Sequence, residues 1–427
     1  MKNIYILGGG TFSDVRCHQS LAVRAFGDTA IELESLFKEQ LALKGLDKKY
    51  QTQLILTRMA QPHGNPYNII TNQDASDVLD TLIADPDTKV IVQNFALCDF
   101  DGQIGDIASG KKAARLRTSN GNVEMVMTPA PKLINKIRQE RKDIFAIGFK
   151  TTDGQSADVQ YLRGLELLKV NSLNLVLAND VVNFRNMIIA PEETRYGEQV
   201  GRDRSTVLKH LVEITISRMQ NHFTRSTVIE GKALDWNGEQ IPESLRTVVN
   251  HCIKEGAYKT FLGKTAGHFA AKLSDNEFAT SIRKSNFNKL NEIGLVKIES
   301  KNNDEVIAHG FKPSVGGQSQ RSIFAAHPEL DCIVHFHCPV KVDNKGDMVP
   351  VAAQWPNECG SHECGKNTSD NLKEIDLGGG DSLKVVYLDK HGPNIVFNRK
   401  TNANKVINFI DRNFDLSAKT GGFVQLQ

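Results

Sequence analysis

The chain has 427 residues, of which 40% are hydrophobic and 24% are charged, and its formal net charge is +2 with neutral histidines. The length predicts two or three domains, and the composition is that of an ordinary globular protein. The small net charge argues against nucleic acid or an anionic membrane as a partner. Seven cysteines, odd in number and unevenly spaced, make no disulfide framework. We expect a cytoplasmic protein, since no apolar run approaches a membrane helix and the start is too Gly-interrupted for a signal peptide.

Short strands alternate with helices over about the first 190 residues. β-Branched runs predict the strands, and apolar residues at helical spacing predict the helices between them. This alternation indicates a mostly parallel sheet covered on both faces. The expected strands are 4–7, 53–57, 89–93, 144–149 and 173–177, and the expected helices are 29–43, 75–84, 131–141, 157–170 and 205–219.

A polar stretch with little pattern, 223–242, predicts a linker. A helix at 243–256 then opens a second pattern of short strands that is richer in His and Gly. The sequence therefore predicts one α/β domain at 1–222 and a second domain at 243–427.

The first expected strand runs into Gly8, Gly9, Gly10 and Thr11. Glycines after a strand let backbone N–H groups approach a phosphate closely. The run by itself is a weak signal, because Ser13 stands where the third glycine of a dinucleotide-binding fingerprint would be. A plain tight turn therefore remains open.

Four segments in a fixed order strengthen this signal, namely 8–16, 95–100, 148–152 and 177–181. Together they resemble the phosphopantothenoylcysteine synthetase family, the CTP-dependent ligases of coenzyme A synthesis, over about residues 1–215. The resemblance implies a Rossmann-like fold, usually dimeric, that binds CTP or another nucleotide with Mg2+ at the strand ends. The residues to which it assigns cofactor binding are Gly8, Gly9, Gly10, Thr11, Asp99, Arg115, Asn179 and Asp180.

The chain departs from that family at two functional positions. Ser20 replaces an asparagine, and Arg115 replaces a lysine, which keeps the positive charge but places it differently. Nucleotide binding, retained ligase chemistry on phosphopantothenate, and an inert Rossmann-like scaffold all remain open.

Two histidines, His335 and His337, stand two residues apart in the β-branched run 331–337. On a strand such residues project from one face and can chelate one metal ion. His391 ends another expected strand, and Gly392 lets the chain turn so that this imidazole points inward. Three imidazoles leave one coordination position open, as a catalytic metal requires. The sequence therefore predicts a divalent-metal site, with Zn2+ as the first expectation.

A series of short motifs in a fixed order surrounds these histidines, at 256–257, 263–268, 278–281, 312–314, 327–329, 335–337 and 391–392. They resemble the class II aldolase/adducin family over about residues 243–415. The resemblance implies an α/β/α domain, sites built between subunits of a tetramer, and loops that grip a substrate phosphate. The substrate-binding residues it implies are Lys264, Thr265, Thr280, Ser281 and Ser314, with Arg283 and Lys284 adding positive charge.

The family's Pro-Ser-x-Glu element supplies an acid/base glutamate, and Gly316 stands in its place here. Without a carboxylate a metal ion can polarise a substrate, but no nearby group takes the proton. Members resembling methylthioribulose-phosphate dehydratase carry the glutamate in the loop after His-x-His, where this chain has Glu358 and, as second choice, Glu363. It remains open that both are surface residues of a non-catalytic relative, as in adducins.

A second metal site is a weaker hypothesis. Cys359, His362 and Cys364 stand close together in that same loop, but their spacing is not a standard structural pattern. A reactive thiol near the main site, or simple loop packing, remains open.

Together these patterns predict a metal-dependent lyase. A divalent ion on a carbonyl and a neighbouring hydroxyl stabilises an enediolate, which serves retro-aldol cleavage, epimerisation and dehydration. We expect a homo-oligomer, dimer or tetramer, that cleaves or dehydrates a small phosphorylated or nucleotide-linked sugar-like compound. Two alternatives remain, a non-catalytic nucleotide- and metal-binding scaffold, and a CTP-dependent acid–amine ligase whose aldolase-like part oligomerises.

Overall fold

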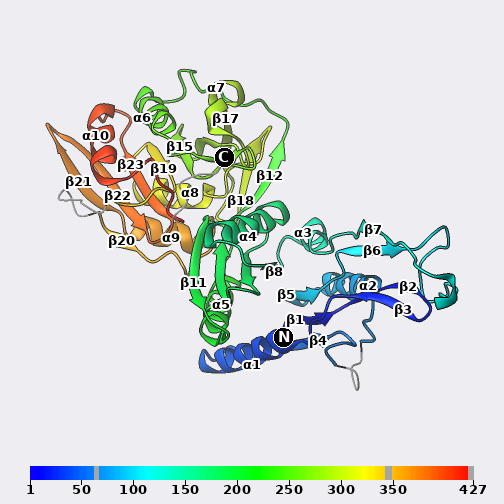
Figure 1. The fold of residues 1–427 in the computed structure, drawn as a ribbon. Helices are drawn as coiled ribbons and strands as arrows, with labels where there is room; N and C mark the ends of the chain where they lie inside the picture. Colours follow the sequence, from blue (N-terminus) through cyan, green and yellow to red (C-terminus); the bar gives the residue numbers. More distant parts are fainter. Residues whose placement is uncertain (62–66, 342–348, 422–427) are drawn as a thin grey trace. The chain divides into compact units, whose positions relative to one another are not determined.

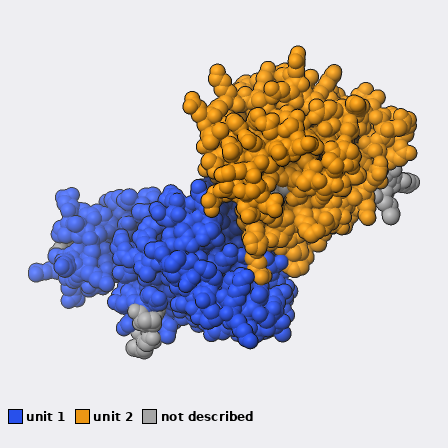
Figure 2. All heavy atoms as spheres, turned by 180° about the vertical axis from the view of Figure 1, so that it is seen from behind, with its two compact units in different colours: residues 1–190, 197–219 blue, residues 191–196, 220–427 orange. Residues whose placement is uncertain are grey.

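A computed structural model of the chain describes residues 1–61, 67–341 and 349–421, which form two compact units (Figure 2). Unit 1 comprises Met1–Ala190 and Gly197–Met219, and unit 2 comprises Pro191–Tyr196 and Gln220–Gln427. The short segment Pro191–Tyr196 therefore belongs to unit 2, although residues of unit 1 flank it on both sides in the sequence.

A seven-stranded sheet forms the centre of unit 1, in the order β11-β10-β9-β8-β5-β1-β4 (Figure 1). The strands from β4 across to β9 pair in parallel, and β10 pairs antiparallel to β9. With helices in its connections, this sheet confirms the expected mostly parallel, Rossmann-like fold. The strands are β1 (Lys2–Gly10), β4 (Tyr50–Leu56), β5 (Thr88–Ala96), β8 (Phe145–Thr152), β9 (Leu175–Asp180), β10 (Arg185–Ala190) and β11 (Thr194–Val200). The helices are α1 (Asp28–Leu43), α2 (Asn72–Ala84), α3 (Asn135–Glu140), α4 (Ala157–Asn171) and α5 (Ser205–Arg218), with a 3-10 turn η1 (Thr118–Asn120).

The elements expected in unit 1 from apolar periodicity are all present, with their ends shifted by a few residues. The structure adds two short hairpins, one of β2 (Phe12–Arg16) with β3 (Gln19–Ala22), and one of β6 (Phe100–Gln103) with β7 (Val126–Pro129). The sequence did not predict them because β3 and β7 are largely exposed and carry no apolar alternation.

The chain reverses its direction of travel across this sheet at β1. From β1 it passes through α1 to β4 on one side, and from β4 it returns through α2 to β5 on the other side. In an open parallel sheet such a switch point opens a crevice beyond the carboxyl ends of the two strands.

A ten-stranded sheet forms the centre of unit 2, in the order β12-β18-β17-β16-β15-β19-β23-β22-β20, with β21 paired to β22. Its neighbours are antiparallel, apart from β12 with β18 and β20 with β22. The strands are β12 (Arg225–Ile229), β15 (His268–Lys272), β16 (Glu277–Ser281), β17 (Leu295–Ser300), β18 (Glu305–His309), β19 (Cys332–His335), β20 (Val351–Ala352), β21 (Lys373–Gly378), β22 (Asp381–Leu388) and β23 (Gly392–Phe397), and a separate ladder joins β13 (Thr260–Phe261) to β14 (Lys264–Thr265). The helices are α6 (Glu243–Lys254), α7 (Leu290–Ile293), α8 (Gly317–Ala326), α9 (His362–Asp370) and α10 (Ala403–Asn413), with a 3-10 turn η2 (Phe287–Lys289).

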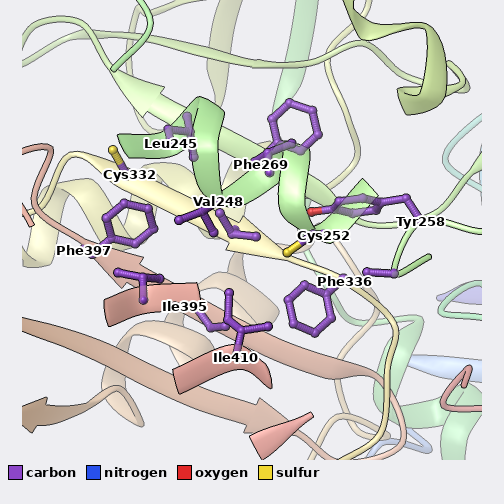
Figure 3. Packing of buried hydrophobic residues seen from close by; sticks show 14 of the residues in the cluster. Leu245, Val248, Cys252, Tyr258, Phe269, Cys332, Phe336, Ile395, Phe397 and Ile410 are labelled. Carbon is purple, nitrogen blue, oxygen red and sulfur yellow. The ribbon is translucent and has the colours of Figure 1, made fainter. Parts of the chain in front are cut away.

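Helices cover both faces of the unit 2 sheet. Successive strand residues alternate between two apolar clusters, so that Phe269 lies in one and Ala270 in the other. Helices α6 and α10 pack on the first cluster, where Val248 of α6 lies over Phe269 and the strands around it (Figure 3). Helix α8 contributes Ile323 and Phe324 to the second cluster, which confirms the expected α/β/α arrangement. No described helix of either unit has the length and apolarity to cross a membrane.

The stretch 223–242 is not a linker in the structure, contrary to the prediction. Its residues 225–229 form β12, which adds in parallel to the edge strand β18. Trp236 is fully buried in the first apolar cluster, 5.5 Å from the ring of Phe269. The prediction was wrong because a single buried tryptophan in a polar stretch has no periodicity that reveals its burial.

We predict that Trp236→Ala lowers the free energy of unfolding of unit 2 by about 3–5 kcal/mol, since it empties a buried aromatic site. Urea denaturation followed by circular dichroism measures this loss. Phe223→Ala is the matched control, because that side chain is 48% exposed and its loss is worth about 0.5 kcal/mol or less. Equal, small losses in both variants would contradict the buried position of Trp236.

Candidate metal centre

The three predicted histidines come from two neighbouring strands of unit 2. His335 is the last residue of β19, and β19 pairs antiparallel with β23, which begins just after His391. The turn that carries His391 is tight, and its backbone N–H donates to the carbonyl of Leu388 at 2.9 Å. A Cβ on Gly392 would lie 2.0 Å from the carbonyl oxygen of Phe336, so only glycine permits this approach of the turn to the chain between His335 and His337.

The structure brings the three imidazoles together in the interior. One ring nitrogen from each of His335, His337 and His391 lies within 4.8 Å of the other two, and all three residues are buried. The Nε2 atoms of His335 and His391 are 3.2 Å apart. The ring centroids of His337 lie 5.1 Å from His335 and 4.7 Å from His391. This group can surround a single ion.

Hydrogen bonds on the far side of two rings determine which nitrogen faces the centre. Nδ1 of His335 donates to the carbonyl of Pro393 at 2.8 Å, and Nδ1 of His391 donates to Oε1 of Gln354 at 3.2 Å. The Gln354 amide is oriented by its own Nε2, which donates to the carbonyl of Asn357 at 2.7 Å. Each imidazole therefore offers Nε2 as an acceptor, in the manner of outer partners that orient metal-binding histidines.

Burial lowers the pKa of His335 to about 4, so this ring is neutral near pH 7. Because the Nδ1 atoms of His335 and His391 are used by their outer partners, the two Nε2 atoms face each other across 3.2 Å. A cation between them can accept a lone pair from each ring. The donor set and its protonation thus fit a divalent metal ion.

A fourth histidine, which the sequence reasoning missed, lies beside this group. His268 opposes His335 across the β15–β19 ladder, and their ring centroids are 4.6 Å apart. Its Nδ1 accepts a hydrogen bond from Nε2 of Gln320 at 2.9 Å, so Nε2 carries the proton. Burial and then the neighbouring His335 lower the pKa of His268 well below its ordinary value. Only strand pairing reveals this position, since His268 belongs to no His-rich run.

His268 also explains the absence of a glutamate at Gly316. A Cβ on Gly316 would lie 2.1 Å from Cδ2 of the His268 ring, so no side chain fits there while the ring keeps its place. The space beside Gly316 is therefore filled by an imidazole.

The two glutamates proposed as catalytic residues have different surroundings. Glu363 lies in the first turn of α9, where its carboxylate accepts the backbone N–H of His222 at 3.0 Å and meets the His222 Nδ1 at 2.8 Å. Glu358 is buried, and the next residue, Cys359, places its Sγ 4.0 Å from Nε2 of His391. The loop that carries Glu358 therefore lies beside the three histidines, whereas the Glu363 carboxylate is bonded to His222.

The predicted second metal set does not assemble. Cys364 packs against Ser319 and Gln354, whereas the His362 ring lies near Thr224 and Asp304. Among the described residues, the group formed by the three histidines is the one that meets the geometric requirement for a metal ion.

The predicted substrate loops converge, with one exception. The backbone N–H of Arg283 donates to Lys312, that of Ser314 donates to Ser281, and that of Thr265 donates to Ser285. Lys264, Arg283 and Lys284 are exposed beside them. Thr280 is the exception, because its buried hydroxyl donates to the carbonyl of Phe269 within the sheet at 3.1 Å.

The glycine run of unit 1 differs from the expected turn. Gly8, Gly9 and Gly10 continue β1 and pair with β5 on one side, and all three are buried. A Cβ on Gly10 would lie 1.9 Å from the carbonyl oxygen of Val23, and the backbone N–H groups of Gly10 and Thr11 donate to Ala25 and Ala96. Close packing of the chain accounts for these glycines.

The other residues assigned to nucleotide binding lie at the end of β9 or in the loops after β5 and β6. Asp99 is exposed and pairs with Lys132, Arg115 is exposed, and Asn179 is half-buried. Asp180 is buried, and its carboxylate accepts backbone N–H groups of the two turns around it and the hydroxyl of Thr152. Although burial opposes ionisation, these donors lower the pKa of Asp180, which gives it a structural role.

A comparison with protein-family models matches part of unit 2. The sequence model described as "Class II Aldolase and Adducin N-terminal domain" matches residues 249–400, which confirms the class II aldolase resemblance for that part. No curated protein matches the chain.

Similar solved structures are of both kinds. The DNA/pantothenate metabolism flavoprotein from Streptococcus pneumoniae is 19% identical with a TM-score of 0.39, covering 50% of this chain and 97% of that one. The C-terminal domain of a bifunctional coenzyme A biosynthesis protein is 12% identical with a TM-score of 0.35, covering 50% and 93%. An L-fuculose 1-phosphate aldolase is 15% identical with a TM-score of 0.30, covering 41% and 84%.

We predict that Gly316→Ala lowers the free energy of unfolding by about 1–3 kcal/mol, because the added methyl group overlaps the His268 ring. His268→Ala in the same chain removes the overlap and recovers the loss caused by the methyl group. Gly317→Ala is the matched control, since nothing lies within 4 Å of a Cβ there and alanine favours the helix by about 0.5–1 kcal/mol. Thermal unfolding measures both variants. Equal stability of Gly316→Ala and Gly317→Ala would contradict the packing of His268 against Gly316.

Proposed function

We propose that unit 2, which contains the class II aldolase and adducin domain at residues 249–400, is a divalent-metal-dependent lyase. The single observation that carries this proposal is the pair of Nε2 acceptors of His335 and His391, 3.2 Å apart in the interior with His337 beside them. A scaffold protein has no need of three buried imidazoles gathered at one point, whereas a metal ion requires such a group.

The ligand types favour zinc or a neighbouring transition metal, since neutral imidazole suits these ions and three imidazoles leave a position for a substrate oxygen. When bound, such an ion supplies Lewis-acid polarisation of a carbonyl or hydroxyl. The chain's own contribution is to hold the rings. Pro393 and Gln354 orient two of them, and burial keeps water from the ring nitrogens.

The converging loops around Ser281, Arg283 and Ser314 support a phosphorylated substrate. The last of these loops leads directly into the N-terminus of α8, which has no side-chain cap, and helix N-termini favour an anion. The exposed side chains of Lys264 and Lys284 add positive charge nearby. We therefore infer carbon–carbon cleavage or dehydration of a small phosphorylated, sugar-like compound.

We predict that the purified chain binds about one equivalent of Zn2+ and that His337→Ala weakens this binding by more than about 100-fold, since loss of an outer partner alone costs about 10–100-fold. Elemental analysis and chelator competition measure the effect. His222→Ala is the control, because its exposed imidazole contacts Glu363. Equal zinc in the parent chain and in His337→Ala would remove the basis of the proposed function.

Unit 1 supports a second proposal, nucleotide binding. Thr11 and Asp99 follow the carboxyl ends of β1 and β5, and Asn179 is one of the last two residues of β9; these are parallel strands with their ends at one edge of the sheet. The first two flank the switch point between β1 and β5, where α/β proteins of this topology bind their ligands. A nucleotide site at this position is consistent with a substrate that itself carries a nucleotide or pantetheine-like group.

Calorimetric titration with CTP, CMP and phosphopantothenate tests this proposal. We expect heat with CTP and a weaker response in Asn179→Ala, which removes a half-buried amide at the strand end. Asn171→Ala is the matched control, because that amide donates to Leu167 within α4. No heat with any of the three compounds would contradict nucleotide binding.

A further inference from the structure

A glutamate from a distant segment lies at the metal centre. Glu193 stands in the segment Pro191–Tyr196, which belongs to unit 2, and its side chain is only 6% exposed. Its Oε2 atom lies 4.0 Å from Nδ1 of His337. The residue adopts a φ of 63°, in the left-handed region that non-glycine residues seldom occupy. Strain of this kind persists where surrounding structure requires a particular placement, and it concentrates at functional sites.

Lys419 holds this carboxylate inside unit 2. Its Nζ lies 2.6 Å from Oε2 of Glu193, and the lysine side chain is also 6% exposed. The next residue, Thr420, donates its backbone N–H to the carbonyl of His337 at 3.1 Å and its hydroxyl to the carbonyl of His391 at 3.0 Å. These two bonds hold Thr420 against the backbones of His337 and His391. The neighbouring Lys419 and its partner Glu193 are thereby held close to these histidines.

The three-histidine group itself contains no carboxylate. Imidazole ligands bring no negative charge to compensate the double charge of a bound ion, and a buried charge without a partner is strongly unfavourable. The position where an aldolase-like chain would carry a glutamate is Gly316, and the ring of His268 fills the space beside it. The carboxylate of Glu193 already lies next to one of the three rings.

We propose that Glu193 is the carboxylate of this metal centre. It is a positioning residue, whose carboxylate lies 4.0 Å from Nδ1 of His337 and acts on that ring by charge. Lys419 is its partner when no ion is bound. The inference rests on the proposed function, since it requires an ion among the three histidines.

The test measures the zinc affinity of the full chain by competition with a metal-sensitive chelator, and the absorption spectrum of the Co2+ form. We expect Glu193→Gln to weaken Zn2+ binding by about 10–100-fold and to change the Co2+ spectrum. Glu192→Gln is the matched control, because this neighbouring glutamate is also buried but bonds to the hydroxyl of Tyr196 at 2.8 Å. It is expected to bind Zn2+ as the parent chain does.

A second variant separates a metal-site carboxylate from a merely structural ion pair. Lys419→Met removes the competing ammonium, so we expect its Zn2+ affinity to equal or exceed that of the parent chain. A structural pair would make Lys419→Met and Glu193→Gln weaken binding alike, which would overturn the proposal. Loss of affinity in Glu358→Gln but not in Glu193→Gln would overturn it as well.

Different results contradict the role of Glu193 and the lyase proposal. If the parent chain binds zinc and Glu193→Gln binds it equally well, this inference alone is contradicted and the lyase proposal stands. If neither the parent chain nor His337→Ala binds zinc, the lyase proposal itself is contradicted.

Discussion

Two acceptor nitrogens, held 3.2 Å apart by hydrogen bonds on the far sides of their rings, are the constraint on which the rest of unit 2 depends. The β19–β23 ladder aligns His335 with the turn that carries His391, and Gly392 lets that turn approach the neighbouring chain. Burial lowers the pKa of His335 to about 4, so this ring is neutral near pH 7 and its Nε2 can accept a cation. The sheet thus places three histidines where they could hold a metal ion.

The surroundings of this centre differ from an aldolase-like pattern in a coordinated way. His268 occupies the space beside Gly316, so an imidazole and a glycine together replace a carboxylate. The carboxylate of Glu193, which is paired with Lys419, approaches the centre from another direction. Fold similarity leaves the chemistry of such a site open, since charge and hydrogen bonding around the ion decide it.

In unit 1, a motif that suggests phosphate binding serves close packing of the chain instead. Gly8, Gly9 and Gly10 read as a phosphate-binding turn, yet in the structure they let β1 pass close to neighbouring backbone and side chains. Asp180 similarly reads as a ligand-binding carboxylate, whereas its oxygens are occupied by the turns that it stabilises. Asp99 lies beyond the end of β5 at the switch point, and Asn179 lies at the end of β9, two strands away from β5.

Apolar periodicity was enough to predict the order and type of the main elements, as with α6, whose residues Leu245, Val248 and Cys252 recur at helical spacing. Strand alternation suggested that His335 and His337 share one face, and His391 was added from a separate strand end that is followed by Gly392. Exposed hairpins, the buried Trp236, the His268–Gly316 contact and the approach of Glu193 to His337 were decided only by the tertiary structure. Each of these depends on contacts between residues far apart in the chain, and local sequence carries no signal for such distances.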